Sequence, residues 1–295
     1  MACQAASNTR HCRPKRQRPM EQFHDGHHVR LRSYVLGTYL HADHDGEGVS
    51  LRRRRASLKQ AWAVHLHLGE DGVQYVLLHS AAYGRYLAAT GDPAPRGLRV
   101  TQRDHDQPQA NAIRWHALRA GIEDDYDIVL RHGALYSYRY LRANRRHLHR
   151  YNSVSAAIFN FSNMMRWIVE PIPARQGVPR LPGSIRARLL IEEGMRQIRF
   201  VPVQANDHDE LFAEEDWATF QFRGRSVYRL RNELATRIGV SDLIMCVRAG
   251  RHGRLTPLVR NLPRDGQTIE IVVIIGGTPA NAQLRHPDVT RSRGR

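Results

Sequence analysis

The side chains of this sequence best suited to metal or acid–base chemistry are its 17 histidines. Several stand at spacings that a metal ion could use, namely His24 with His27 and His28, His41 with His44, His65 with His67, and His147 with His149. His65 and His67 alternate with apolar residues in a strand-like stretch that begins at Trp62, so both rings should point to solvent. Because no cysteine or carboxylate stands at ligand spacing beside this pair, we expect surface histidines, no metal site and no cofactor.

The common signatures of enzyme active sites are absent from the sequence. It contains no GxSxG elbow, no GxxxxGK[ST] loop, no HExxH motif and no GxGxxG after a strand-like run. A paired acid and base or an activated nucleophile would leave some such trace. The acidic run of Glu123, Asp124, Asp125 and Asp127 lacks the alternating spacing of a calcium-binding loop, so we interpret it as an exposed turn. We therefore predict a non-catalytic binding protein.

The net charge of +17 is spread unevenly along the chain. Residues 1–19 carry +5 and residues 285–295 carry +3, whereas residues 20–173 and 174–284 carry only +5 and +4. Each candidate folded part is mildly basic, which does not favour a groove that follows nucleic-acid phosphates. The sharpest basic run could contact an acidic partner, although such runs are more often solvated loops; it consists of Arg52, Arg53, Arg54 and Arg55.

The sequence suggests neither secretion nor a membrane partner. No run approaches the roughly 18 uncharged apolar residues of a spanning helix, and the first 19 residues lack the apolar core of a secretory signal. Cys3, Cys12 and Cys246 are odd in number and form no CxxC pair, so reduced thiols are expected. We expect a cytoplasmic protein, and the basic run from Arg13 to Arg18 leaves import into the nucleus as an alternative.

The elements that must position these side chains come from a unit repeated three times. Trp62, Trp115 and Trp167 stand 53 and 52 residues apart, and a Tyr-Leu pair precedes each of them. Every unit alternates apolar and polar residues, as strands with one buried face do. About four short strands fit in each unit, which predicts an all-β β-trefoil over residues 20–173. We expect its core to contain Leu31, Leu40, Trp62, Leu78, Leu87, Trp115, Leu130, Leu141 and Trp167.

A second domain is predicted after the repeats. Residues 174–194 are rich in proline and glycine and predict a linker. In residues 195–277, two strand-like runs precede a helix that Ser226 can cap and that has Val227, Leu230 and Leu234 on one face; further strands follow. This order is that of an α+β ubiquitin-like β-grasp domain. Residues 1–19 should be a disordered basic leader and residues 278–295 a basic tail.

Several motifs closely resemble a plant family known as domain of unknown function 569. They are Val29 to Ser33 with Tyr39-Leu40, Tyr140 to Asn144 with Asn152 to Val154, Phe220 to Leu234, and Cys246 to Arg251 with Gly253 to Leu258. The resemblance covers roughly residues 20 to 289. The N-terminal part of that family is similar to the fascin-like, actin-cross-linking β-trefoil, so the resemblance implies an actin-binding label by fold.

Two binding hypotheses follow. In the first, the protein is an adaptor that binds filamentous actin through exposed arginines of the trefoil and recruits another protein through the β-grasp domain. In the second, the trefoil is a lectin-like, glycan-binding module and the β-grasp domain docks a protein. Ricin-type lectins place QxW in each repeat; here Gln60-Ala61-Trp62 keeps this pattern, whereas Ile113-Arg114-Trp115 and Met165-Arg166-Trp167 depart from it.

Overall fold

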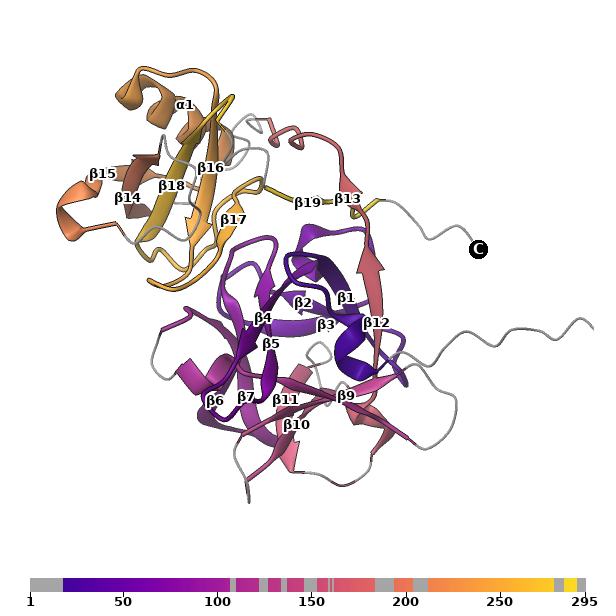
Figure 1. The fold of residues 1–295 in the computed structure, drawn as a ribbon. Coiled ribbons are helices and arrows are strands. Elements are labelled where there is room, and N and C mark those ends of the chain that lie inside the picture. The colour runs from indigo at the N-terminus through magenta and orange to yellow at the C-terminus, as the bar shows by residue number, and fades with distance from the viewer. Residues whose placement is uncertain are drawn as a thin grey trace, which may run out of the picture.

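The computed structural model shows two domains (Figure 1) and describes residues 18–106, 110–121, 127–133, 137–145, 153–158, 160, 162–183, 194–203, 212–278 and 284–290. The acidic residues 123–125, His147, His149 and nearly all of the basic leader lie outside the described residues. No helix in the described ranges is long and apolar enough to cross a membrane.

The first domain consists of twelve strands that form one closed sheet among the described residues. The strands are β1 (His28–Ser33), β2 (Tyr39–Ala42), β3 (Val49–Arg52), β4 (Trp62–Leu68), β5 (Gln74–Ser80), β6 (Tyr86–Ala94), β7 (Gly97–Arg103), β8 (His116–Arg119), β9 (Ile128–His132), β10 (Arg139–Asn144), β11 (Ser153–Ile158) and β12 (Trp167–Ile172). The first and last strands pair antiparallel, with Leu31 opposite Val169, so the sheet has closed edges there. The connecting 3-10 helices are η1 (Pro19–Gln22), η2 (Leu58–Gln60), η3 (Ala110–Ile113) and η4 (Asn163–Met165).

The three repeats share one packing arrangement around their tryptophans. A 3-10 helix precedes Trp62, Trp115 and Trp167 in turn, and all three indoles are fully buried. Each indole N–H donates to a leucine carbonyl in the second strand of its own unit; the acceptors are Leu40 at 3.3 Å, Leu87 at 2.9 Å and Leu141 at 2.9 Å. The repeated Tyr-Leu and Trp positions therefore mark one polar contact that every unit needs to bury its indole. All nine residues expected in the core are fully buried.

The acidic run needs one correction. Asp127 was expected in an exposed turn, but its side chain is buried at the start of the third repeat. The Arg166 guanidinium donates to both of its carboxylate oxygens. The prediction was wrong for this residue because its partner lies 39 residues away, beyond the reach of local charge patterning.

The second domain is a five-stranded mixed sheet with one helix among the described residues. Its elements are β14 (Met195–Val203), η5 (Glu214–Asp216), β15 (Ala218–Arg223), α1 (Val227–Ile238), β16 (Leu243–Arg248), β17 (Leu255–Pro257) and β18 (Ile269–Ile275). The sheet order is β15-β14-β18-β16-β17, with β14 and β18 parallel in its centre. This is the predicted ubiquitin-like β-grasp arrangement.

Helix α1 forms where local signals place it and covers one face of this sheet. The Ser226 side chain accepts a hydrogen bond from the Arg229 amide at 3.3 Å, and Gly239 ends the helix in the left-handed region at φ 76°. Val227, Leu230 and Leu234 are buried against the sheet, at the spacing of one helical face. The opposite face of the sheet carries a second buried apolar cluster, against which Phe212 and Trp217 pack.

The chain returns to the trefoil after the second domain. Strand β13 (Ala174–Arg175), in the expected linker, pairs with β19 (His286–Pro287), in the segment expected to be a basic tail. Just beyond β19, the Val289 carbonyl accepts a hydrogen bond at 2.7 Å from Arg30, a fully buried trefoil arginine. The two domains are therefore connected by two passages of the chain, which lie side by side (Figure 1).

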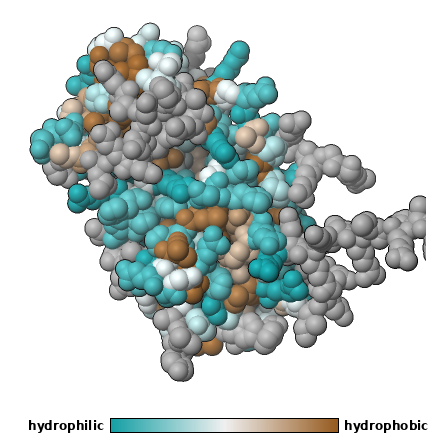
Figure 2. All heavy atoms as spheres, in the orientation of Figure 1, coloured by the Kyte–Doolittle hydropathy of each residue, from teal (hydrophilic) through white to brown (hydrophobic). Residues whose placement is uncertain are grey.

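Polar contacts cross the boundary between the domains, where Figure 2 shows a band of hydrophilic residues. The Tyr86 hydroxyl accepts from the Arg254 amide at 2.9 Å. The buried His79 ring and the Thr256 hydroxyl are 2.9 Å apart. Backbone also meets backbone, because the Arg264 amide donates to the His44 carbonyl at 2.9 Å. These bonds hold β17 and its flanking loops against the trefoil.

Candidate binding site

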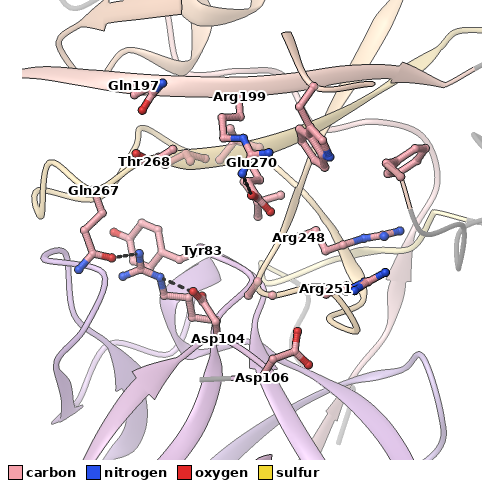
Figure 3. A pocket seen from close by; sticks show the side chains of 18 of the residues that line it. Tyr83, Asp104, Asp106, Gln197, Arg199, Arg248, Arg251, Gln267, Thr268 and Glu270 are labelled. Carbon is pink, nitrogen blue, oxygen red and sulfur yellow. Dashed lines mark hydrogen bonds and ion pairs between the residues drawn. The ribbon is translucent and has the colours of Figure 1, made fainter. Parts of the chain in front are cut away.

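A cleft of about 850 Å³ lies between the trefoil and the face of the second sheet opposite α1. Figure 3 shows side chains from both domains pointing into it. Its position is typical of ligand sites, which favour domain boundaries.

The wall from the second domain consists of alternate residues of adjacent strands. Gln197 and Arg199 on β14 lie beside Glu270 on β18, and Thr268 just precedes that strand. Since α1 covers the residues of opposite parity, these side chains project from the other face. Arg199 donates to Glu270 at 2.8 Å, which fixes a donor and an acceptor next to each other (Figure 3).

Two aromatic rings add an apolar surface to this wall. Phe212 and Trp217 meet edge to face, with ring centroids 5.9 Å apart. Arg248 lies over Phe212 and Arg199 over Trp217, each with its guanidinium carbon 5.3 Å from the ring centroid. The rings and guanidinium groups thus orient one another before any ligand binds.

The trefoil side of the cleft is built on a turn that approaches the second sheet closely. Gly84 has φ +77°, and a Cβ there would lie 2.8 Å from the Val247 side chain. The next residue, Arg85, crosses the boundary and donates to Asp265 at 2.9 Å. Its guanidinium also lies 3.7 Å from Asp104. Glycine at this position lets the turn place Arg85 between the two domains.

Burial changes the acidity of the groups on this side. Burial raises the pKa of the Tyr83 hydroxyl to about 12, so this phenol remains a neutral donor and acceptor. Burial also raises the pKa of Asp104, against the opposing effect of Arg85. Among the described residues, the lining of the cleft contains arginines, carboxylates, amides and aromatic rings, but no serine, cysteine or lysine. Such a set supports hydrogen bonding and stacking to a ligand.

One corner of the cleft gathers potential metal ligands. His105 and Asp106 follow β7, and His252 lies in the turn after β16; one ligand atom of each falls within 4.8 Å of the others. The sequence did not indicate this group, because 146 residues separate Asp106 from His252. Neither His105 nor His252 belongs to the closely spaced histidine groups found in the sequence.

The prediction for His65 was wrong. Its ring does not face solvent but lies 3.0 Å from the Tyr86 hydroxyl and stacks on His105, with centroids 5.9 Å apart. Burial, followed by the nearby Arg254, lowers its pKa to about 3. Strand alternation correctly directs His65 away from the trefoil core, but this outer face is covered by the second domain. His67, two residues further, is half-buried.

The four-arginine run lies outside the cleft, where Arg52 ends β3 and the other three begin the connection to η2, and its side chains are of two kinds. Arg52 lies 3.8 Å from Asp43, and Arg55 donates to Glu170 at 3.1 Å. Arg53 and Arg54 are exposed. Only the middle two arginines therefore project outward for a partner.

Only one motif singled out in the sequence contains residues that line the cleft. The run from Cys246 to Arg251, used to recognise the family resemblance, contains cleft residues including Arg248 and Gly250. Cys246 itself is buried on β16, where burial raises the pKa of its thiol and leaves it unreactive. The two glycines at 250 and 253 were the available signal that this segment makes a close backbone approach.

Comparison with solved structures finds similarity across the trefoil half of the chain. A designed three-fold symmetric protein, ThreeFoil, is 18% identical, with a TM-score of 0.40, and covers 50% of this chain and 99% of its own. The SDF2-like protein from Arabidopsis thaliana is 16% identical, with a TM-score of 0.42, covering 50% and 93%. A Macrolepiota procera ricin B-like lectin in complex with lactose is 15% identical, with a TM-score of 0.39, covering 50% and 96%.

Family models account for both domains. No curated protein shows a significant match to this chain. Residues 20–170 match the beta-trefoil domain of unknown function (DUF569), and residues 194–274 match the DUF569 associated ubiquitin-like domain. These matches confirm the family resemblance and the predicted order of a β-trefoil followed by a ubiquitin-like β-grasp domain. With the trefoil model covering more than half of its 295 residues, the chain belongs to the DUF569 family.

Proposed function

We propose that this chain is a non-catalytic binding protein whose ligand occupies the cleft between the trefoil and the ubiquitin-like domain. The observation that supports this function is the cleft of about 850 Å³, to which both domains contribute oriented polar groups. A cavity of this size can surround a ligand of a few rings. The domain contacts around it provide a preformed site.

The ligand that fits this cleft best is an uncharged, hydroxyl-rich one, such as a saccharide. The Arg199–Glu270 and Arg85–Asp104 pairs place donors beside acceptors, which suits neighbouring hydroxyl groups. Phe212 and Trp217 can pack against the apolar face of a sugar ring. Four arginines and three carboxylates line this space among the described residues, so their charges nearly balance, which favours an uncharged ligand over a strongly charged one.

A saccharide array probed with the full chain, followed by titration of the best ligand, tests this function. Gln197 is exposed and points into the cleft, so Gln197→Trp should fill it and weaken binding at least ten-fold with little effect on the unfolding temperature. The matched control is Gln74→Trp, at an exposed strand position in the trefoil, which should bind normally. No binding by the wild type, or equal binding by both variants, would contradict the proposal.

A second candidate function is binding to an acidic protein surface, with filamentous actin as the partner suggested by the fascin-like resemblance. The supporting observation is that Arg53 and Arg54 project from the trefoil while their neighbours pair with carboxylates. Co-sedimentation at physiological salt tests it. The charge reversal Arg53→Glu/Arg54→Glu should abolish pelleting, whereas Arg96→Glu/Arg99→Glu, at two other exposed arginines, should not.

A further inference from the structure

His105, Asp106 and His252 bring two imidazoles and a carboxylate together from both domains. The Nδ1 atoms of His105 and His252 are each 2.9 Å from the same oxygen, Asp106 Oδ1. The Asp106 and His105 side chains are largely buried, while that of His252 is 61% exposed. The group is thus held at the domain boundary with one open side.

The backbone fixes this group before any ion binds. The His105 amide donates to the Ala249 carbonyl at 2.8 Å, and the His252 amide donates to Asp106 Oδ2 at 3.2 Å. The second bond occupies one carboxylate oxygen and leaves Oδ1 directed at both rings. Gly250, at φ +86°, permits this approach, because a Cβ there would lie 2.9 Å from Asp106 Oδ2.

The surroundings also orient the His105 ring. Tyr86 packs on it edge to face with centroids 5.3 Å apart, and the His65 ring stacks on it with centroids 5.9 Å apart. The Tyr86 hydroxyl is itself held by the Arg254 amide. Such supporting contacts are what a ligating imidazole needs to keep one orientation.

Coordination distances fit this arrangement with small adjustments. Tetrahedral Zn²⁺, with bonds of about 2.0–2.1 Å, separates neighbouring ligand atoms by roughly 3.3 Å. The two 2.9 Å separations would have to open by a few tenths of an ångström. Three protein ligands leave a fourth position for water or a ligand hydroxyl, on the side where His252 is exposed.

We propose that His105, Asp106 and His252 form a binding site for a divalent transition metal ion of the Zn²⁺ class, which connects the trefoil to the ubiquitin-like domain. Two imidazoles and one carboxylate suit Zn²⁺ and its neighbours in the transition series, whereas Mg²⁺ and Ca²⁺ prefer all-oxygen sites.

Titration of the untagged full chain with Zn²⁺ alone tests the site, with no saccharide present, so its outcome is independent of the proposed function. The wild type should bind with a component that His252→Gln weakens at least ten-fold. Zn²⁺ should also raise the unfolding temperature of the wild type more than that of His252→Gln. His24→Gln, at an exposed histidine of the trefoil, is the matched control and should behave as the wild type.

Asp106→Asn provides a second variant that keeps the shape of the side chain, for use if the histidine variants fold poorly. It should retain the circular dichroism spectrum and lose the same Zn²⁺ component. Replacing Zn²⁺ by Co²⁺ should give the intense visible absorption of a four-coordinate ion in the wild type. Equal Zn²⁺ binding by the wild type and these variants, or equal stabilisation by Mg²⁺, would overturn the proposal.

Discussion

The burial of His28 makes the stability of the trefoil depend on pH. His28 is buried beside the returning C-terminal segment, and burial, reinforced by His286, His27 and Arg285, lowers its pKa to about 3. A histidine in the unfolded chain has a pKa of about 6.5. Between these two values the unfolded state binds a proton that the folded state does not, so stability falls as the pH falls.

From pH 7 to pH 5, His28 alone should reduce the free energy of unfolding by about 2 kcal/mol. Urea denaturation at the two pH values measures this difference. In His28→Gln the difference should shrink by about that amount, whatever the cost of the substitution at pH 7. His24→Gln, at an exposed position, should leave the difference unchanged. An unaltered pH dependence in His28→Gln would contradict this assignment.

Gly250 should be irreplaceable for two separate reasons. Alanine there must adopt φ +86°, and its Cβ must also enter the space of Asp106 and the His105 amide. Gly72→Ala isolates the first effect, because Gly72 has φ +71° with nothing within 4 Å of the added Cβ. Thermal unfolding should show a loss of about 1 kcal/mol for Gly72→Ala and a clearly larger one for Gly250→Ala. Equal losses would mean that the residues around Gly250 can move to accommodate the added methyl group.

At the scale of elements, the strands and the helix follow from local signals in the sequence. The Tyr-Leu and Trp positions locate the second strand and the 3-10 turn of each repeat, because both serve the same indole hydrogen bond. Ser226 and Gly239 likewise set the ends of α1. Each of these signals acts within one unit of the chain.

The α1 cap gives a direct measure of one such signal. Ser226→Ala removes the acceptor for the Arg229 amide and should destabilise the ubiquitin-like domain by about 1 kcal/mol in chemical denaturation. Ser226→Asn retains a capping oxygen and should restore most of that loss. If alanine and asparagine behaved alike, the cap would contribute nothing.

The cleft could not be predicted in the same way, since it depends on how the two domains meet. His65 shows the reason: its strand parity was right, yet the surface it reaches is covered by residues near Arg254. Arg85 pairs with Asp265, 180 residues away, and no periodicity joins two such positions. The family motif around Gly250 was visible in the sequence, but its partner at His105 was not.

At the scale of the whole molecule, the C-terminal segment should stabilise the trefoil. Deleting residues 285–295 removes the Val289 carbonyl that Arg30 uses and leaves a buried guanidinium short of an acceptor. We expect a loss of about 1–3 kcal/mol in trefoil stability. Deleting only residues 291–295 is the matched control and should have no effect. In the longer deletion, Arg30→Met should cost less than in the full chain, which a double-mutant cycle can measure.

The pairing of β13 with β19 changes how the domains of this chain should be counted. Topologically, the ubiquitin-like domain is an insertion between the two strands of a separate ribbon that contacts the trefoil through Arg30 and Val289. Its entry and exit points lie next to each other, so a short turn from Arg175 to His286 could replace the whole insertion and keep the ribbon paired, although it would expose trefoil groups such as His79 that the insertion covers. A trefoil cut off at Pro173, by contrast, would keep its twelve strands but lose the Val289 carbonyl that Arg30 uses. The cleft is thus a surface that the trefoil acquires with its insertion, and grafting the insertion elsewhere should not transfer it.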